Sequence, residues 1–345
     1  MKALVCYDRA PGCMELRDLP EPEMADDEML VEVAFAGICG SDLKLYHGNH
    51  PHATPPIVPG HEFSGTIARV GSAIKKFRPG DRITGLGKVY PEGTVVGDDD
   101  NINSPSGTKV AGLHMDGAFA RYLTMKERFA LKLPDEVSLR AAAVCEPLGI
   151  ALNAVMERAR LQPFHRVLVS GPGPVGLLVV QVARLYGAEV MVAGTSVDEG
   201  RLALARTLGA TETIDVQKQD LADAVASFTG GQGMDAAFEC AGAAGSVNNC
   251  LASLRWYGQH VQIGTFPAGK QVEVLLNHVL FKELTISGVY GHVWSYWAKG
   301  LRLLSQHRVS TEAVASHTFP LSRWQEAFDV AERREGVKVL ITPED

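Results

Sequence analysis

Apolar and polar residues alternate in several short segments of the first 135 residues. The alternation is clear at 30–35 and 63–70, and a Pro-Gly turn at 79–80 leads into another short apolar run. A period of two is typical of strands that bury one face. Together with a first strand at 1–7, these segments predict a small, barrel-like β domain.

The pattern changes at about residue 140, where apolar strands begin to alternate with helical stretches. A strand at 167–170 precedes a helical run that extends to Tyr186, and a second helix is predicted at 201–208. Further strands are predicted at 189–193, 212–216, 234–239, 259–263 and 284–288. This alternation predicts a parallel sheet wound on both faces, and hence an α/β fold.

The rest of the chain predicts one long loop and a mixed C-terminal segment. Residues 88–112 are polar and rich in turn-forming residues, which favours a loop over a core element. Near the C-terminus, a helix at 297–307 precedes a strand at 315–319, and a helix at 324–334 precedes a strand at 337–341.

Composition and charge narrow the class of protein. The chain has 345 residues, a length typical of two domains, and 46% of them are hydrophobic, enough for large cores. A net charge of −7 without a basic block argues against nucleic acid or a membrane as the main partner. The most apolar stretch, 167–183, is broken by glycine and proline, and we see no signal peptide. Six scattered cysteines predict no disulfide framework, so we expect a cytoplasmic protein.

A glycine-rich turn between a predicted strand and a predicted helix indicates a dinucleotide site. The turn consists of Gly171, Pro172, Gly173, Pro174, Val175 and Gly176. The first glycine permits the tight turn, the second lets the backbone approach a pyrophosphate, and the third lets helix and strand pack closely. The free N–H groups of the helix then face the phosphates. We predict NAD(P) binding here; the alternative is a glycine-rich turn without a ligand.

The end of the second strand of this α/β region bears on the choice of cofactor. An NAD site usually places an acidic residue there, but this chain has Gly194. Thr195, Ser196 and the nearby Arg201 are suited to a 2′-phosphate, whereas the acidic pair at 198–199 would repel one. We expect NADP(H), with NAD(H) as the alternative.

A thiolate, an imidazole and a carboxylate occur close together in the β-rich region. Cys39, His61 and Glu62 form a ligand set for one Zn²⁺ that leaves a position for substrate. Taken singly, each residue also suits an ordinary core thiol, a surface histidine or a solvated carboxylate. No cysteine lies between Cys39 and Cys145, which excludes a four-cysteine structural zinc site in that interval.

Several motifs in combination resemble one family. They are GICGSD at 37–42, GHE at 60–62, DGAFA at 116–120, EPL at 146–148, the glycine turn at 171–176 and GVKV at 336–339. With these motifs the chain resembles the zinc-dependent medium-chain dehydrogenase/reductase family, in its polyol (sorbitol-like) and L-threonine 3-dehydrogenase branch. The resemblance implies a GroES-like catalytic domain at 1–148 and 289–345, with a Rossmann domain inserted at 149–288.

The resemblance also implies roles for the metal ligands. Cys39 and His61 would hold one catalytic zinc per subunit. Glu62 and Glu146 would serve as a third ligand, or as neighbours that exchange with water. Zinc with an open position lowers the pKa of a bound alcohol, and the nicotinamide accepts the hydride.

The proton path is where the chain departs from the family pattern. Ser41 matches the hydroxyl that takes the alcohol proton, and Asp42 matches a carboxylate that orients the ligand histidine. Many relatives have a histidine two residues after that aspartate, but here the position is Lys44. Either Lys44 or His47 is expected to complete the relay; a plain surface lysine is the alternative for Lys44.

We therefore expect an oxidoreductase that oxidises a secondary alcohol with NAD(P)⁺. The substrate would be a polyol, a sugar acid or a hydroxy-amino acid such as threonine, and the product a ketone. By analogy with the family we expect a homodimer or homotetramer. Two other hypotheses remain: a zinc-free quinone or enone reductase on the same fold, and a non-catalytic nucleotide-binding sensor.

Overall fold

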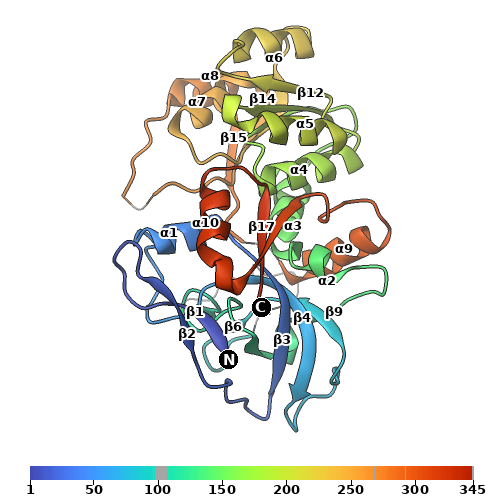
Figure 1. Ribbon diagram of the computed structural model, residues 1–345. Helices are drawn as coiled ribbons and strands as arrows, with labels where there is room; N and C mark the ends of the chain where they lie inside the picture. The colour runs from blue at the N-terminus through green and yellow to red at the C-terminus, as the bar shows by residue number, and fades with distance from the viewer. Residues whose placement is uncertain (96, 98–106, 268, 292, 344–345) are drawn as a thin grey trace. The chain divides into compact units, whose positions relative to one another are not determined.

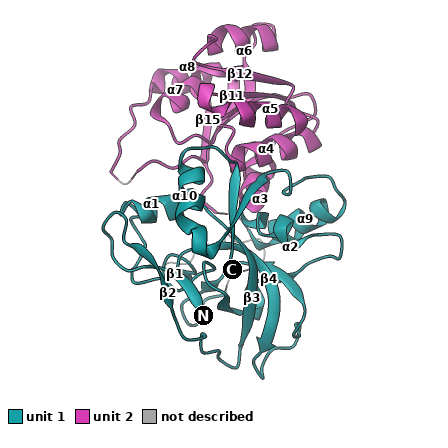
Figure 2. Cartoon of the chain, viewed as in Figure 1, with its two compact units in different colours: residues 1–146, 293–345 teal, residues 147–292 magenta. Residues whose placement is uncertain are grey.

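The computed structural model describes residues 1–95, 97, 107–267, 269–291 and 293–343. The chain divides into two compact units (Figure 2). Unit 1 comprises Met1–Glu146 and Val293–Asp345, and unit 2 comprises Pro147–His292. Among the described residues, none of the helices combines the length and the apolar character that a membrane span requires.

Unit 1 is built on a seven-stranded sheet (Figure 1). The strands in spatial order are β16 (Ala315–Pro320), β17 (Lys338–Thr342), β3 (Glu28–Gly37), β4 (Glu62–Val70), β5 (Arg82–Gly85) and β9 (Ala130–Lys132), with β8 (Tyr122–Lys126) also paired to β3. A separate antiparallel pair consists of β1 (Lys2–Cys6) and β2 (Met14–Asp18). Strand β8 alternates buried and half-buried residues, whereas β3 buries Met29, Leu30 and Val31 in succession.

The helices of unit 1 are short and pack on this β core. They are α1 (Gly40–Tyr46), α2 (Leu139–Ala142), α9 (Trp294–Ser305) and α10 (Trp324–Glu332). The core itself joins residues far apart in the sequence: Phe63 of β4 and Phe119 are buried together with Phe328 of α10. The last helix and strand therefore complete the domain that the first residues begin.

The polar stretch at 88–112 is not a loop throughout. Its ends form two short strands, β6 (Lys88–Val89) and β7 (Lys109–Val110), which pair antiparallel. Lys88 is only 1% exposed. The prediction of a loop missed this hairpin because tertiary packing, not hydrophobic pattern, buries its first residue. The part of the stretch at 96 and 98–106 lies outside the described residues.

Unit 2 is a parallel six-stranded sheet, as the strand–helix alternation predicts. The strands in spatial order are β12 (Glu212–Asp215), β11 (Glu189–Gly194), β10 (Arg166–Ser170), β13 (Met234–Glu239), β14 (Leu254–Gln262) and β15 (Thr285–Gly288). All neighbouring pairs are parallel. Chain order reverses between β10 and β13, so right-handed crossovers place helices on both faces of the sheet.

The helices of unit 2 connect these strands (Figure 1). They are α3 (Cys145–Leu152, which begins in unit 1), a π-helical segment at Asn153–Arg158, α4 (Pro174–Leu185), α5 (Glu199–Thr207), α6 (Leu221–Thr229), α7 (Ala244–Ser253) and α8 (Leu276–Lys282). Helix α4 starts at Pro174, within the glycine motif 171–176, and packs against β10 and β11. The first βα connection of the sheet therefore carries the predicted cofactor motif.

Candidate active site

Two neighbouring strands position the predicted metal ligands. Cys39 caps α1 two residues after the end of β3, and His61 precedes β4, which begins at Glu62. Gly37 faces Glu62 across the β3–β4 ladder. A Cβ atom at Gly37 would lie 2.5 Å from Oε2 of Glu62, so the glycine of the GICGSD motif leaves room for this carboxylate.

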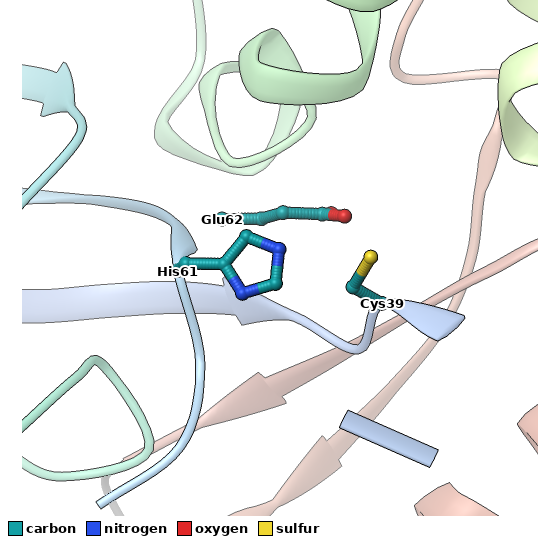
Figure 3. Close-up of side chains that lie close together, drawn as sticks. All are labelled: Cys39, His61 and Glu62. Carbon is teal, nitrogen blue, oxygen red and sulfur yellow. The ribbon is translucent and has the colours of Figure 1, made fainter. Parts of the chain in front are cut away.

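The structure brings Cys39, His61 and Glu62 together (Figure 3). One ligand atom from each side chain lies within 4.8 Å of the others. His61 and Glu62 are buried, yet Nδ1 of His61 and Oε2 of Glu62 accept or donate no hydrogen bond. Buried polar atoms are nearly always satisfied. A thiolate, a buried imidazole with an unsatisfied nitrogen and a buried carboxylate fit a tetrahedral Zn²⁺ site with an open position.

The electrostatics of this group favour a cation. Burial by itself lowers the pKa of His61, but the negative charges of Cys39, Asp42 and Glu146 outweigh it and raise the pKa to about 10. The same charges that attract a proton to the imidazole would stabilise a divalent ion at this place.

Asp42 acts on His61 through its charge, and its hydrogen bonds go to the backbone beside the ligands. Its buried carboxylate accepts hydrogen bonds from the backbone N–H of Cys39 at 2.8 Å and of Gly60 at 3.3 Å. It therefore fastens the backbone beside both ligands, while Nδ1 of His61 has no hydrogen bond. Burial raises the pKa of Asp42, and the charge of His61 together with these two N–H donors partly offsets the effect.

Glu146 lies near the ligand group but outside it. The set of ligand atoms within 4.8 Å of one another does not include this residue. Burial and the charge of Glu62 raise the pKa of Glu146 to about 7, against the opposing charges of His61, Lys338 and Lys88. Glu146 is thus close enough to interact electrostatically with the site. This proximity is what its second expected role requires, that of a neighbour of the zinc ligands that exchanges with water.

Lys338 is a site residue that the sequence did not single out. It lies on β17, is 3% exposed, and donates hydrogen bonds to Oε1 of Glu62 at 2.8 Å and to the carbonyl of Ile38 at 2.9 Å. Its Nζ is also 2.7 Å from Oε2, a purely electrostatic contact. The signal in the sequence was a lysine within an apolar strand, in the GVKV motif that supported only the resemblance.

The residues predicted for the proton path have different surroundings. Oγ of Ser41 is buried and makes no hydrogen bond. Burial lowers the pKa of Lys44, which the nearby Cys39 partly offsets. His47 is half exposed, and its Nε2 lies 2.6 Å from a carboxylate oxygen of Glu332 on α10. The structure thus holds His47 in a hydrogen bond with Glu332 at the surface.

The glycine turn has the geometry that its spacing predicts. Gly171 has φ of +102°, and a Cβ there would lie 2.8 Å from the backbone nitrogen of Ala241. A Cβ at Gly176 would lie 2.1 Å from the carbonyl oxygen of Gly171. By contrast, a Cβ at Gly173 meets nothing within 4 Å, and this residue caps α4 ahead of Pro174. The space beside Gly173 is where a pyrophosphate would approach the helix start.

The two hydroxyl groups predicted to bind a 2′-phosphate donate hydrogen bonds to carboxylates of the protein itself. Oγ1 of Thr195 donates to Asp198 at 2.8 Å, and Oγ of Ser196 donates to Asp215 at 2.6 Å. Arg201 also lies 3.6 Å from Asp198. The hydrogen bond from Ser196 lowers the pKa of Asp215, which keeps this carboxylate charged. Residues predicted to bind a phosphate are thus held by negative groups, and Asp215 was not considered from the sequence.

Comparisons with known proteins agree with this geometry. Residues 25–135 match the alcohol dehydrogenase GroES-like domain, and residues 174–306 match the zinc-binding dehydrogenase family. The chain is 35% identical to D-arabitol-phosphate dehydrogenase of Enterococcus avium over 96% of this chain and 95% of that protein. It is 33% identical to sorbitol dehydrogenase of Halalkalibacterium halodurans over the full length of both. A provisionally assigned zinc-binding dehydrogenase of Sinorhizobium meliloti 1021, solved bound to NADP, has a TM-score of 0.91 and 30% identity, covering 99% of each chain.

A parallel sheet with a glycine turn, joined in one chain to a Cys-His-Glu group, defines an oxidoreductase that acts on CH–OH groups of small-molecule alcohols. The chain belongs to the zinc-type medium-chain dehydrogenase/reductase family. The predicted α/β fold, with a GroES-like domain and a Rossmann sheet, is confirmed. Zinc and a nicotinamide cofactor are also confirmed at the level of the family.

Proposed function

We propose that this protein is a zinc- and NAD(P)-dependent dehydrogenase that oxidises a secondary alcohol to a ketone. Its substrate class is a polyol, a sugar acid or a hydroxy-amino acid. The observation that supports this most is the group of Cys39, His61 and Glu62, in which the buried Nδ1 of His61 has no hydrogen bond. The functional domains are proposed as 1–148 with 289–345 for catalysis, and 149–288 for the cofactor.

Cys39, His61 and one carboxylate would hold a single zinc ion in each subunit. Glu62 belongs to the compact ligand group, whereas Glu146 is the neighbour that could exchange with it. When bound, zinc supplies a Lewis acid that lowers the pKa of the alcohol, and a bound nicotinamide accepts the hydride. Lys338 fixes Glu62 through its hydrogen bond and so positions the carboxylate.

Ser41 would accept the proton that the alcohol loses. Its buried, unbonded hydroxyl is suited to a partner that arrives with substrate. Lys44 is the better candidate for the next step, because burial lowers its pKa toward the working range. The hydrogen bond of His47 with Glu332 disfavours the other candidate. Ser41→Ala and Lys44→Met should each lower kcat about 10²-fold or more, while His47→Gln should not.

The cofactor would bind with its pyrophosphate at the turn 171–176 and its adenosine ribose near Thr195, Ser196 and Arg201. We propose that Asp215 weakens NADP(H) binding, because its charge would oppose a 2′-phosphate beside Ser196. Asp215→Asn should raise the ratio of kcat/KM for NADP⁺ over NAD⁺ about tenfold, the size of one charge interaction. An unchanged ratio would place the 2′-phosphate elsewhere.

The decisive experiment measures metal and activity on the same preparation. Zinc content is determined for the protein as purified, and polyols, sugar acids and threonine are screened with NAD⁺ and NADP⁺. Cys39→Ser should lose both zinc and activity. The matched control is Cys13→Ser, since this free thiol lies outside the ligand group.

Each rival hypothesis has its own outcome in this experiment. A metal-free preparation that reduces quinones or enones, with Cys39→Ser fully active, would replace the proposal by a zinc-free reductase. Tight cofactor binding without turnover of any alcohol would indicate a nucleotide-binding sensor.

A further inference from the structure

A second group of polar side chains, all basic, lies beside the metal ligands in unit 1. We call His50, His52, Lys88 and His114 the basic cluster. The charges of His52, His61 and His114 all act on His50, and the charge of Lys88 acts on His114. None of these four residues belongs to the proposed zinc ligands. In a chain with a net charge of −7, such a local concentration of basic groups is not a consequence of composition.

Backbone contacts bring the members of the basic cluster together. The segment that follows α1 is joined to the turn after β7, because the N–H of Thr54 donates to the carbonyl of Leu113 at 3.0 Å. Lys88 is paired with Val110 across the β6–β7 hairpin, and the N–H of Val110 donates to His114. Three separate segments of the chain thus meet at the cluster.

The same turn packs against the metal-ligand segment. The N–H of Ala118 donates to the carbonyl of Gly60 at 2.9 Å, and a Cβ at Gly112 would lie 2.8 Å from the nitrogen of Gly60. Gly60 directly precedes His61 in the chain. The turn that carries His114 is therefore joined to the segment that carries His61.

Hydrogen bonds fix the tautomers of two imidazoles. Nδ1 of His50 accepts from the backbone N–H of Ala53 at 3.1 Å, and Nδ1 of His114 accepts from that of Val110 at 3.2 Å. Each neutral ring then carries its proton on Nε2, which is a donor. Neither Nε2 makes a hydrogen bond within the described part of the chain. The turns use only Nδ1, and both rings are partly exposed, so each Nε2 donor is open to water or to a ligand.

Lys88 adds a charge to these two donors. It is almost fully buried, which is rare for a lysine. Burial lowers its pKa to about 8, and Glu146 is the acidic group that acts against this shift. The ammonium is therefore still charged at neutral pH. One buried ammonium and two imidazole donors are the kind of set that binds the oxygens of a phosphate or a carboxylate.

We propose that the basic cluster binds an anionic group on the substrate, so that the enzyme acts on a polyol that carries a phosphate monoester or a carboxylate. A phosphate monoester is the better fit, because its three terminal oxygens accept several hydrogen bonds at once. The proposal rests on the proposed function, since it names the substrate class of the same site.

The test compares matched substrates with the zinc-loaded enzyme. Sorbitol, sorbitol 6-phosphate and gluconate are assayed with wild type and with His50→Asn and His114→Asn. The Oδ1 of asparagine keeps the acceptor that Nδ1 supplies to the turn, while the Nε2 donor is lost. His307→Asn is the control, because this exposed histidine lies outside the cluster and has φ of +54°, which asparagine tolerates.

We expect wild type to prefer an anionic substrate over sorbitol by at least about tenfold in kcat/KM, and each cluster variant to reduce that preference about tenfold. Sorbitol turnover should change less than about threefold in the same variants. Preference for the phosphate or for gluconate identifies the anion. Equal kcat/KM for sorbitol and both anions, unaltered by the variants, overturns the inference and leaves the proposed function intact.

A binding measurement covers the case in which no alcohol is oxidised, which would count against the proposed function. Inorganic phosphate is titrated into wild type and the three variants by calorimetry at constant ionic strength. The inference predicts a Kd that is weaker by about tenfold in His50→Asn and His114→Asn and unchanged in His307→Asn. Equal phosphate affinity in all four proteins contradicts it.

Discussion

Lys338 and Glu62 form an ion pair that water does not reach, with side-chain exposures of 3% and 1%. Removing one partner of such a pair leaves the other charge buried and unpaired. We expect Lys338→Met in the metal-depleted protein to lower the free energy of unfolding by about 3–5 kcal/mol. Urea denaturation measures the change.

The double variant Lys338→Met/Glu62→Gln is the control, because it removes both charges and should recover more than half of the loss. A single variant as stable as wild type would mean that Glu62 does not depend on Lys338. Zinc affinity should fall together with stability, since the carboxylate loses the group that positions it.

Lys88 destabilises the fold, in contrast to the stabilising pair of Lys338 and Glu62. Its pKa is about 8 in the folded protein, against about 10.4 for an unfolded chain. A depressed lysine pKa destabilises the fold fully below pH 8, and the penalty disappears as pH rises toward 10.4. Lys88→Met should therefore stabilise the protein at pH 7 by about 1–3 kcal/mol.

The gain should shrink between pH 8 and pH 10, which thermal unfolding of both proteins across this range can follow. A gain that does not vary with pH would show that packing, not charge, is responsible. A stabilising substitution that impairs turnover of anionic substrates would indicate that the lysine is kept for binding at the expense of stability.

At the scale of elements, two glycines of the turn between β10 and α4 separate folding from cofactor binding. A Cβ at Gly176 would collide with the Gly171 carbonyl at 2.1 Å, whereas a Cβ at Gly173 has open space. Gly176→Ala should lower the melting temperature by several degrees, about 2 kcal/mol or more. Gly173→Ala should fold normally and bind NAD(P)H at least about tenfold more weakly.

Fluorescence titration with NADPH and NADH gives the affinity, and calorimetric scans give the stability. Wild-type affinity in Gly173→Ala would rule out a close approach of the pyrophosphate to this residue.

The sequence predicted elements whose side-chain pattern is regular, and missed features that depend on packing between distant segments. Strand β13 was predicted with its observed limits, because every residue from Met234 to Glu239 suits a strand. Strand β14 begins at Leu254, five residues before the predicted start. Its first residue pairs with Met234 of β13, and regular pairing resumes at Gln259 after a register shift.

The metal-ligand group was predictable because its three residues lie in short motifs. The burial of Lys88 and Lys338 was not, because a lysine in a polar stretch or in a strand gives no sign of what covers it. Likewise, the hydrogen bond between Ser196 and Asp215 joins the ends of β11 and β12. It could not be predicted, because the sequence does not show which strands are neighbours in the sheet.

At the scale of the whole molecule, unit 2 exposes an apolar surface next to an unpaired strand edge. Strand β15 is the last strand of the sheet, and Ile286 on it is 48% exposed. Helix α8, which follows β14 in the chain, exposes Leu276, Leu280 and Phe281 at 64–68%. Natural proteins rarely leave a strand edge and large apolar side chains open together.

We expect a second copy of the chain to cover this surface, with the two β15 edges related by a two-fold axis, because a two-fold axis brings identical surfaces together. Light scattering coupled to size exclusion should give at least a dimer for wild type. Leu280→Glu/Phe281→Glu should shift it to the monomer, since two charges at each copy's contact would be buried without partners. Phe164→Glu, at a phenylalanine that is 85% exposed and lies outside this surface, is the control. If the double variant kept the wild-type mass, the subunits would have to associate through another surface, and the exposed side chains of α8 would need a different partner.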